Sequence, residues 1–516
     1  MTTSRRGASR RASHPLLVAG IVCGLVLSTT GVAGGASPSP TAGSGWNEAQ
    51  ATGVDPRPNI VLILTDDQVP GTIEYMPQVS SLLVDQGTRF THVFDNNPLC
   101  CPARTTIMTG LTSGHNGVWG NDNGAHSGFA GFVANGNQDR QLFGWLHGAG
   151  YRTALVGKFL NGYLVPDVSW VMPGVDDWQV FMLDDPALAQ SGCQASGYFA
   201  TCYSSNGTLE AHGVGEYSTT TSGQKAVDFI RSVPQDQPLF LYYAPRAPHG
   251  PTLPEAKYKG ACPALPPVRP PSYDRVIAGG PAYMTRLGPL SERDRRSLDR
   301  QWIRACRTLL SVDDRVADIV QALSDEGRLH DTLIMYASDN GFLFGEHRWK
   351  GKTVPYEESI RVPVIVRDDA LIPAGMQGTA VSDQITSLDY APTFLQAAGL
   401  SRDLDGQSLF PLLGGAGTWV PQDSILIEQG GEIIGPVGKP MPPPYCGVRT
   451  SGFLYARYKT GEEELYDLAA DPFELANVAS DELYGQVLAQ LRDETRARCD
   501  PPPPGYTWPA HSRVPR

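Results

Sequence analysis

Asn59-Ile60-Val61-Leu62-Ile63-Leu64-Thr65-Asp66-Asp67-Gln68 is the stretch of sequence that decides the fold. Residues 60–64 form a continuous apolar run, which is typical of a β-strand whose two faces are both covered. The run ends abruptly in two adjacent carboxylates, Asp66 and Asp67. The stretch therefore predicts a fully buried strand that presents polar groups at its carboxyl end.

The same pattern recurs three times along the chain. Apolar runs end in polar groups at residues 153–156 before Lys158, residues 239–243 before His249, and residues 332–336 before Asp339 and Asn340. Helical patterns lie between the runs, at residues 141–146, 223–233 and 292–323. Strands that alternate with helices predict an α/β fold with a mostly parallel sheet flanked by helices. Ligands of such sheets gather beyond the carboxyl ends of the strands, so we expect a site there.

Changes in composition divide the chain into five parts. We expect a signal peptide and the start of a linker over residues 1–43, a linker over 44–57, the α/β domain over 58–420, a smaller C-terminal α+β subdomain over 421–500 and a disordered tail over 501–516. The linker is rich in Ser, Pro, Gly and Thr. Within the α/β domain, the Pro- and Gly-rich residues 251–290 predict a long surface excursion.

The first residues have the pattern of a signal peptide. Four arginines before residue 12 precede an apolar segment at residues 16–27 and small residues at 31–36. The apolar segment is too short for a membrane-spanning helix. We therefore expect a secreted or periplasmic protein with no membrane attachment after signal cleavage, exported by either the general or the twin-arginine route.

Charge and cysteine content narrow the function further. The formal net charge of −12 excludes a general nucleic-acid binder, and an anionic substrate would need a few placed cations to capture it. Nine cysteines fit an oxidising compartment. Spacing alone does not fix connectivity, but plausible disulfides are Cys193–Cys202, Cys262–Cys306 and Cys446–Cys499, with Cys101 left over and buried.

A second stretch, Asn97-Pro98-Leu99-Cys100-Cys101-Pro102-Ala103-Arg104-Thr105-Thr106-Ile107-Met108-Thr109-Gly110, places a thiol at the predicted start of a helix. A proline is tolerated in the first turn, and a glycine is a typical helix stop. Cys100 would lie at the positive end of the helix dipole, where a thiol ionises easily. The alternatives are a disulfide cysteine, a zinc ligand or a buried thiol, although the chain has no Cys-x-x-Cys pair for zinc.

Asp66, Asp67, Asp339 and Asn340 supply three carboxylates and an amide from two strand ends. Ligands that are all oxygen select Ca²⁺ or Mg²⁺ over zinc. The alternative is that the aspartates are solvated turn formers or helix caps. Both pairs follow very apolar strands, however, where an unpaired carboxylate cluster would repel itself.

The pattern Cys100-x-Pro102-x-Arg104, followed by Thr109-Gly110, resembles the signature of the type I, formylglycine-dependent sulfatases. The resemblance implies an alkaline-phosphatase-like sheet, and it extends to Glu464-Leu-Tyr-Asp467 and Asp471-Pro-Phe-Glu474 near the C-terminus. Lys158-Phe-Leu-Asn161 is similar to the N-acetylglucosamine-6-sulfatase and heparan endosulfatase branch. Leu160 stands where many other members carry a histidine, so Asn161 is expected only to orient the substrate.

The resemblance also implies roles for individual residues. A separate formylglycine-generating enzyme would convert Cys100 to an aldehyde whose hydrate is the nucleophile. The implied catalytic residues are Cys100, Arg104, Lys158, His249 and Lys352, and the implied metal ligands are Asp66, Asp67, Cys100, Asp339 and Asn340, with Ca²⁺ usual and Mg²⁺ possible. Arg104 would hold the hydrate, and Lys158 and Lys352 would bind the sulfate oxygens. His249 would protonate the leaving oxygen. The alternatives are that Lys158 and Lys352 are solvated lysines and that His249 is a structural loop histidine. Lys350 competes with Lys352 for its role, and His347 could also reach the substrate.

The function expected from this resemblance is hydrolysis of sulfate monoesters of sugars, of the N-acetylglucosamine-6-sulfate type found in glycosaminoglycans. Aryl sulfates would serve as artificial substrates. Two alternatives stay open: a phosphonate or phosphate ester hydrolase of the same superfamily, and a sulfated-glycan-binding protein in which Cys100 is never converted.

Overall fold

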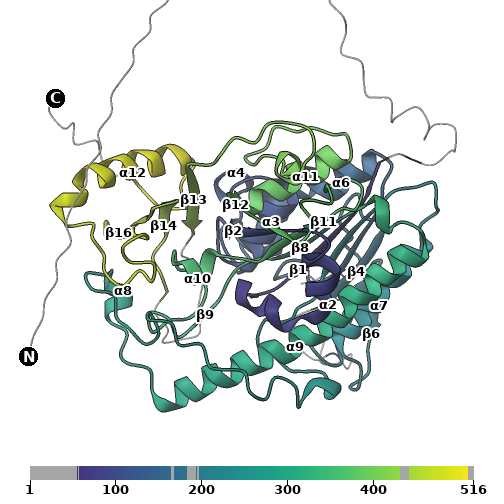
Figure 1. Ribbon diagram of the computed structural model, residues 1–516, viewed down its shortest axis with the longest axis horizontal. Helices are drawn as coiled ribbons and strands as arrows, with labels where there is room; N and C mark the ends of the chain where they lie inside the picture. The colour runs from purple at the N-terminus through teal and green to yellow at the C-terminus, as the bar shows by residue number, and fades with distance from the viewer. Residues whose placement is uncertain are drawn as a thin grey trace, which may run out of the picture. The chain divides into compact units, whose positions relative to one another are not determined.

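The computed structural model describes residues 55, 57–163, 168–182, 193, 197–430 and 441–508 (Figure 1). The predicted signal peptide, nearly all of the predicted linker and residues 509–516 of the predicted tail lie outside the described residues. Within the described ranges, no helix is both long enough and apolar enough to cross a bilayer.

A ten-stranded sheet forms the centre of the structure, with the order β12-β2-β11-β8-β1-β7-β3-β4-β5-β6. Its strands are β1 (Asn59–Thr65), β2 (Thr88–Phe94), β3 (Arg152–Gly157), β4 (Asp177–Met182), β5 (Cys202–Ser205), β6 (Thr208–Ala211), β7 (Leu239–Ala244), β8 (Thr332–Ser338), β11 (Val364–Arg367) and β12 (Thr379–Thr386). The neighbours β8, β1, β7, β3 and β4 are all parallel, whereas β11, β5 and β6 pair antiparallel. The mostly parallel sheet predicted from the sequence is confirmed.

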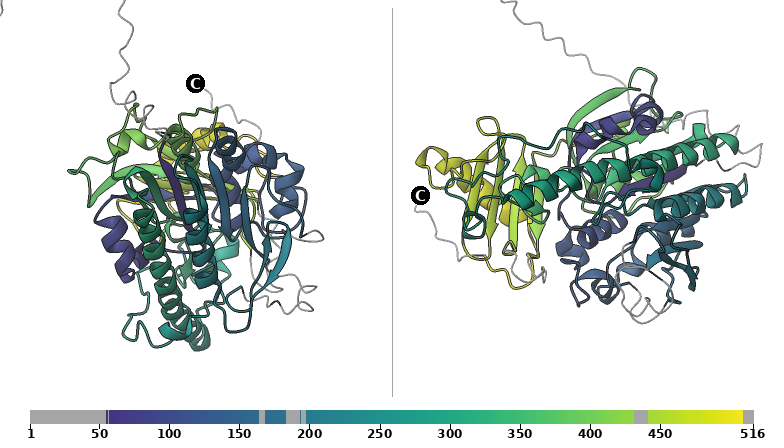
Figure 2. Two further views of the ribbon diagram at one scale, coloured as in Figure 1. Left: turned by 90° about the vertical axis from the view of Figure 1, so that its right-hand side faces the viewer. Right: turned by 90° about the horizontal axis from the view of Figure 1, so that it is seen from below.

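Helices cover both faces of this sheet. The helices of this part of the chain, apart from the excursion before α9, are α2 (Pro77–Val79), α3 (Cys100–Thr109), α4 (Ser113–Asn116), α5 (Gly128–Ala134), α6 (Leu142–Gly148), α7 (Ser218–Ser232), α9 (Glu292–Asp325), α10 (Glu357–Ile360) and α11 (Tyr390–Ala397). Alternate residues of a strand point to opposite faces. Ile60, Leu62 and Leu64 pack with residues of α3, α6 and α11, whereas Val61 and Ile63 pack with residues of α7 and α9, which lie side by side (Figure 2).

The long helix α9 begins with a capping box, in which the Ser291 side chain accepts from the backbone of Asp294 and the Asp294 side chain accepts in return. The helix ends at Asp325, two residues beyond the prediction. The preceding Pro- and Gly-rich excursion contains only short helical turns, among them α8 (Ala282–Thr285). A disulfide between Cys262 and Cys306 attaches this excursion to α9.

A second, antiparallel sheet follows the main one, in the order β13 (Ser424–Gln429), β14 (Tyr445–Thr450), β15 (Phe453–Tyr458) and β16 (Glu463–Asp467). Helix α12 (Gly485–Arg498) packs on it through Leu488 and Leu491. This arrangement confirms the predicted C-terminal α+β subdomain. A small hairpin, β9 (Leu343–Phe344) with β10 (Lys350–Gly351), lies between β8 and β11 in the chain.

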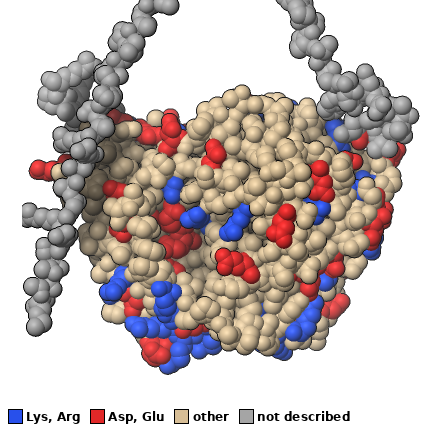
Figure 3. Space-filling view, in the orientation of Figure 1, with Lys and Arg blue, Asp and Glu red and all other residues tan. Residues whose placement is uncertain are grey.

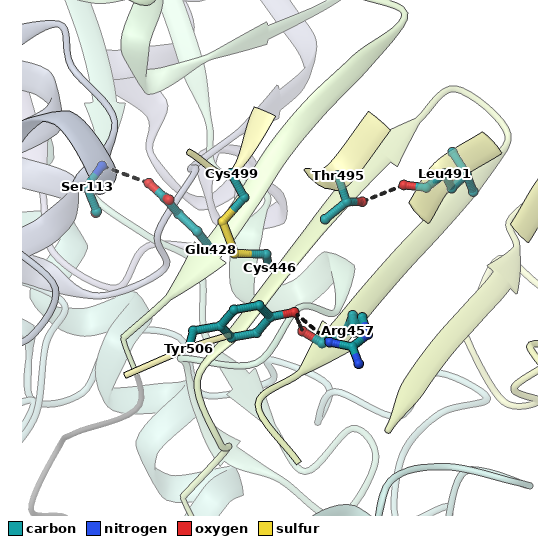
Figure 4. Close-up of a disulfide and its surroundings, with 8 residues drawn as sticks. All are labelled: Ser113, Glu428, Cys446, Arg457, Leu491, Thr495, Cys499 and Tyr506. Carbon is teal, nitrogen blue, oxygen red and sulfur yellow. Dashed lines mark hydrogen bonds between the residues drawn. A yellow bond between two sulfur atoms is a disulfide. The ribbon is translucent and has the colours of Figure 1, made fainter. Parts of the chain in front are cut away.

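The end of the described chain is fixed to this second sheet (Figure 4). Cys446 of β14 forms a disulfide with Cys499, just after α12. Tyr506 is 5% exposed, and its hydroxyl donates to the carbonyl of Arg457 at 3.3 Å. The expectation of a disordered tail is therefore wrong for residues 501–508, because the buried ring of Tyr506 attaches them to the sheet just after the disulfide at Cys499.

All three disulfides proposed from the sequence are present, including Cys193–Cys202. Cys100 and Cys101 are free, and both are buried. The structure therefore fixes the connectivity that the spacing left open.

Candidate active site

The polar groups that follow four strands meet at one edge of the main sheet. Asp66 and Asp67 follow β1, and Asp339 and Asn340 follow β8. Lys158 follows β3 and His249 lies in the loop after β7. Because β8, β1, β7 and β3 are parallel neighbours, their carboxyl ends lie at the same edge. The convergence predicted from the sequence is thus present in the structure.

Helix α3 brings Cys100 to this edge. Leu99 is the extended residue before the helix, Pro102 lies in the first turn, and Gly110 ends the helix in the left-handed conformation at φ 68°. Cys100 is 1% exposed. Its sulfur lies 3.5 Å from Asp66 Oδ1 and accepts a hydrogen bond from Lys352 Nζ at 2.8 Å. The thiol therefore lies between a carboxylate and an ammonium group, at the positive end of a helix dipole.

The acidic residues contact one another through hydrogen bonds. The Asp67 backbone N–H donates to Asp339 Oδ1 at 3.2 Å, and Asn340 Nδ2 donates to Asp67 Oδ1 at 2.7 Å. Asp67 adopts the left-handed region at φ 69°, which is uncommon for a residue with a side chain. One ligand atom from each of Asp66, Asp67, Cys100 and His249 lies within 4.8 Å of every other.

Arg104 lies one helical turn after Cys100 and is 1% exposed. Its Nε donates to Asp339 Oδ2 at 2.9 Å, and one terminal nitrogen donates to the carbonyl of Lys158 at 3.0 Å. The other terminal nitrogen lies 3.9 Å from Asp66 Oδ2 and makes no hydrogen bond within the described structure. Arg104 therefore neutralises two buried carboxylates from one position.

Two lysines complete the cluster. Lys158 Nζ contacts Asp66 Oδ2, and Lys352 Nζ contacts Asp67 Oδ1 as well as Asn340 Oδ1 at 3.1 Å. Burial opposes the charge of each lysine, but the neighbouring carboxylates outweigh it and raise the pKa of both. Both ammonium groups thus stay charged inside the site. Lys352, and not its exposed neighbour Lys350, reaches Cys100.

His249 is the accessible member of the set, with a side chain that is 29% exposed. Its Nδ1 lies 2.8 Å from the carbonyl of Gly250, and its Nε2 lies 3.8 Å from Asp67 Oδ2. Removal from water lowers the pKa of His249, while the charges of Asp66 and Asp67 oppose that change. The ring is held by one nitrogen and leaves the other toward the reaction centre.

The buried carboxylates differ in protonation. Burial alone would raise the pKa of Asp66, but the charges of Lys158, His249, Arg104 and Lys352 hold it well below its usual range. Burial and the charge of Asp66 instead raise the pKa of Asp339 to about 7. A cation held by both would favour the ionised form of each.

The donor set fits a hard divalent cation. Asp66, Asp67, Asp339 and Asn340 present oxygen atoms, the ligands that Ca²⁺ and Mg²⁺ prefer. The ammonium of Lys352 already contacts oxygens of both Asp67 and Asn340. These oxygens therefore converge on a position that favours positive charge.

A cavity of about 640 Å³ opens beside the cluster. Asp67 and His249 line one part of it, and Arg300 and Arg304 of α9 line another. Neither arginine was predicted as a site residue; their spacing of four residues on one helix is the signal that could have found them. A smaller cavity of about 240 Å³ is lined by Lys158 and by three amide side chains, Asn121, Asn123 and Asn161.

His347 lies elsewhere than the sequence suggested. Its side chain is fully buried, its ring packs 4.6 Å from that of Tyr356, and its Nε2 lies 4.0 Å from Glu474. It does not line the cavity beside His249.

Leu160 is 6% exposed within the main core, and Asn161 donates its backbone N–H to the sulfur of Cys101 at 3.1 Å.

Solved structures share this fold. A protein in complex with its substrate D-glucosamine-2-N,6-O-disulfate superposes with a TM-score of 0.69 at 22% identity, over 86% of this chain and 98% of that one. Because the identity is low, this likeness establishes the fold alone.

Two curated relatives are similar in sequence. The human N-acetylglucosamine-6-sulfatase is 28% identical over 500 residues, which cover 88% of each chain. A Drosophila melanogaster extracellular sulfatase SULF-1 homolog is 32% identical over 391 residues, which cover 73% of this chain and 33% of the relative. This chain therefore spans about a third of the length of the Drosophila protein. These relatives confirm the resemblance to the N-acetylglucosamine-6-sulfatase branch.

Family models match most of the chain. The C-terminal model of N-sulphoglucosamine sulphohydrolase matches residues 345–499. The sulfatase model matches residues 58–400, the range that carries Cys100 and every acidic residue of the cluster, and the chain thus belongs to the sulfatase family.

Proposed function

We propose that this protein hydrolyses sulfate monoesters of sugars, and that Cys100 carries the reaction after conversion to formylglycine. The observation that carries the proposal is the placement of the Cys100 sulfur, 3.5 Å from Asp66 Oδ1 and 2.8 Å from Lys352 Nζ. A buried reactive group with both an acid and a cation in contact suits attack on an anionic ester. The named activities of the relatives support the substrate class.

Conversion requires a partner enzyme. Formylglycine forms when the partner enzyme oxidises the Cys100 side chain with molecular oxygen, so that the C–S bond breaks and an aldehyde C=O bond forms. The hydrate of that aldehyde supplies the nucleophilic hydroxyl. Cys100 is 1% exposed, so a modifying enzyme would reach it before the chain folds. This order also fits an exported protein that is modified in an extended state.

Asp66, Asp67, Asp339 and Asn340 would hold a divalent cation, with Ca²⁺ favoured and Mg²⁺ possible, beside the converted Cys100. Such an ion would supply Lewis-acid stabilisation of a negatively charged oxygen. The chain's own residues have separate tasks. Arg104 fixes Asp339 and keeps the buried acids neutralised, so the site is organised before the substrate arrives.

Lys158 and Lys352 would bind the sulfate oxygens. Both keep their charge because carboxylates contact them, so each places an ammonium group at the site. In its doubly protonated form, His249 would protonate the leaving oxygen from Nε2, because Nδ1 keeps its own proton in the bond to the Gly250 carbonyl. The sugar would lie in the cavity of about 640 Å³, within the range of small-molecule sites of about 300–1,000 Å³.

The test is hydrolysis of a monosulfated amino sugar and an aryl sulfate by protein co-expressed with a formylglycine-generating enzyme. Peptide mass spectrometry follows the loss of sulfur at Cys100. We expect turnover that scales with conversion and disappears in Cys100→Ala, while Cys101→Ser, at the adjacent buried thiol, retains it. Full turnover by Cys100→Ala, or a preference for a phosphonate ester over the sulfate, contradicts the proposal.

A further inference from the structure

The cavity beside the site has a wall that the proposed reaction does not use. Ser297, Arg300, Gln301 and Arg304 line it, and they are spaced three and four residues apart on α9. This spacing places them on one face of the helix. The opposite face is buried through residues such as Leu298, Trp302 and Ala305.

The two arginines of this wall differ from most others on the helix. Arg295 pairs with Asp274, Arg296 pairs with Glu292, and Arg307 donates to the carbonyl of Ala261. Within the described residues, neither Arg300 nor Arg304 has an ion pair or a side-chain hydrogen bond, and both are exposed. Their guanidinium groups are therefore available to a ligand in the cavity.

The acidic net charge of the chain makes the positive charges of Arg300 and Arg304 significant for an anionic ligand. The chain has a formal net charge of −12, so an anionic ligand is repelled by most of its surface. Figure 3 shows Lys and Arg side chains gathered over the part of the molecule where Figure 1 places the first half of α9. Asp67, which already contacts Lys352, is the acidic member of the cavity lining. The wall thus supplies positive charge at the mouth of a site that takes an anion.

We infer that Arg300 and Arg304 form a subsite for a second anionic group, a sulfate or a carboxylate, on the sugar whose sulfate ester is cleaved. The inference rests on the proposed function and narrows it to sugars that carry more than one negative charge. Guanidinium groups bind sulfate and carboxylate oxygens in pairs of parallel hydrogen bonds. Two of them, one helical turn apart, suit an anion held beyond the reaction centre.

The experiment compares three substrates of the converted enzyme: a 6-sulfated amino sugar, the same sugar with a second sulfate, and a disaccharide that joins the 6-sulfated ring to a uronate. We expect the double variant Arg300→Gln/Arg304→Gln to raise KM about tenfold for the substrates with a second anion, with kcat retained. KM for the monosulfated sugar should change less than about twofold. The disulfated and uronate arms show whether sulfate or carboxylate is preferred.

Arg296→Gln, on the same helix but paired with Glu292, is the matched control and should change no parameter. The expected KM difference should also shrink as salt rises, because exposed charges are screened. An equal change for all three substrates, or no change for any, overturns the subsite.

Binding separates this inference from the proposed function. In a Cys100→Ala background, calorimetry measures the affinity for the disulfated sugar without turnover. A loss of affinity when the two arginine substitutions are added supports the subsite. It does so even if the converted wild type hydrolyses none of the substrates, because that failure would contradict only the proposed function. Equal affinity with and without the arginines, or no binding to the Cys100→Ala protein, overturns the subsite.

Discussion

The carboxyl edge of the main sheet and the core of the C-terminal sheet both bury carboxylates, but they stabilise them in different ways. Asp66 is surrounded by cations, with Lys158 and Arg104 nearby. Glu464 of β16 has no ion pair within the described structure. Hydroxyls of Tyr356, Tyr458 and Tyr466 donate to it instead, at 3.0, 2.6 and 2.6 Å.

The two environments have opposite effects on protonation. The cations hold the pKa of Asp66 well below its usual range despite burial. Burial raises the pKa of Glu464 to about 7, because neutral hydroxyls offset it only in part. A buried carboxylate that is held by hydroxyls can therefore remain neutral near pH 7, whereas one that is surrounded by fixed positive charges stays ionised.

The largest effect is expected from Arg104→Ala. The substitution leaves two buried carboxylates without their shared cation, so we expect turnover to fall at least about 100-fold and the free energy of unfolding to fall by about 3–5 kcal/mol. Steady-state kinetics and denaturant unfolding measure the two. Arg328→Ala is the control, because this buried arginine donates to backbone carbonyls and should lower stability while kcat is kept. Equal kcat in the two variants would contradict the assigned role.

Lys352→Ala removes the cation that contacts both Cys100 and Asp67. We expect kcat to fall about 100-fold, since one preorganised charge at the reacting group is lost. Kinetics on the monosulfated sugar measure this change. Lys225→Ala removes a lysine that pairs with Glu210 on the surface, and it should leave kcat unchanged. Retention of kcat by Lys352→Ala would show that the contact with Cys100 plays no part in turnover.

Glu464→Gln tests the other half of the comparison. The folded pKa of about 7 lies above the ordinary value of 4.5, so the folded protein binds this proton more tightly than the unfolded chain. The contribution of Glu464 to the free energy of unfolding is then complete below about pH 4.5 and is lost as the pH rises through 7, by about 1–3 kcal/mol. Between pH 5 and pH 8, the free energy of unfolding measured from denaturant curves should fall less in Glu464→Gln than in the wild type. The same loss in both proteins would refute the assignment.

Tyr506→Phe is expected to have the smallest effect. It removes the hydrogen bond that the hydroxyl donates to the Arg457 carbonyl and the one that it accepts from the Arg457 side chain, and it keeps the buried ring (Figure 4). We expect a loss of about 0.5–1.5 kcal/mol in the free energy of unfolding and no change in kcat. Tyr506→Ala should cost more, because the ring is also lost. If the two variants are equally stable, residues 501–508 do not pack as described.

Much of the fold followed from local sequence patterns. Continuous apolar runs predicted the buried strands β1, β3, β7 and β8, because a strand covered on both faces needs apolar residues at every position. Abrupt polar endings predicted the edge where the site lies. The Cys-x-Pro-x-Arg spacing predicted a helix start with Cys100 and Arg104 one turn apart. Cysteine spacing suggested the disulfide pairs without fixing them.

The sequence by itself determined the buried strands β1, β3, β7 and β8, the helices α6, α7 and α9 between them, and the polar groups at the strand ends, because these depend on residues close together in the chain. Tertiary structure alone decided that Lys352 contacts Cys100, that Arg300 and Arg304 face the cavity, and that His347 is buried away from it. It also decided that residues 501–508 pack on the second sheet through Tyr506. Each of these depends on segments far apart in the chain, whose contacts and desolvation arise only when the elements pack.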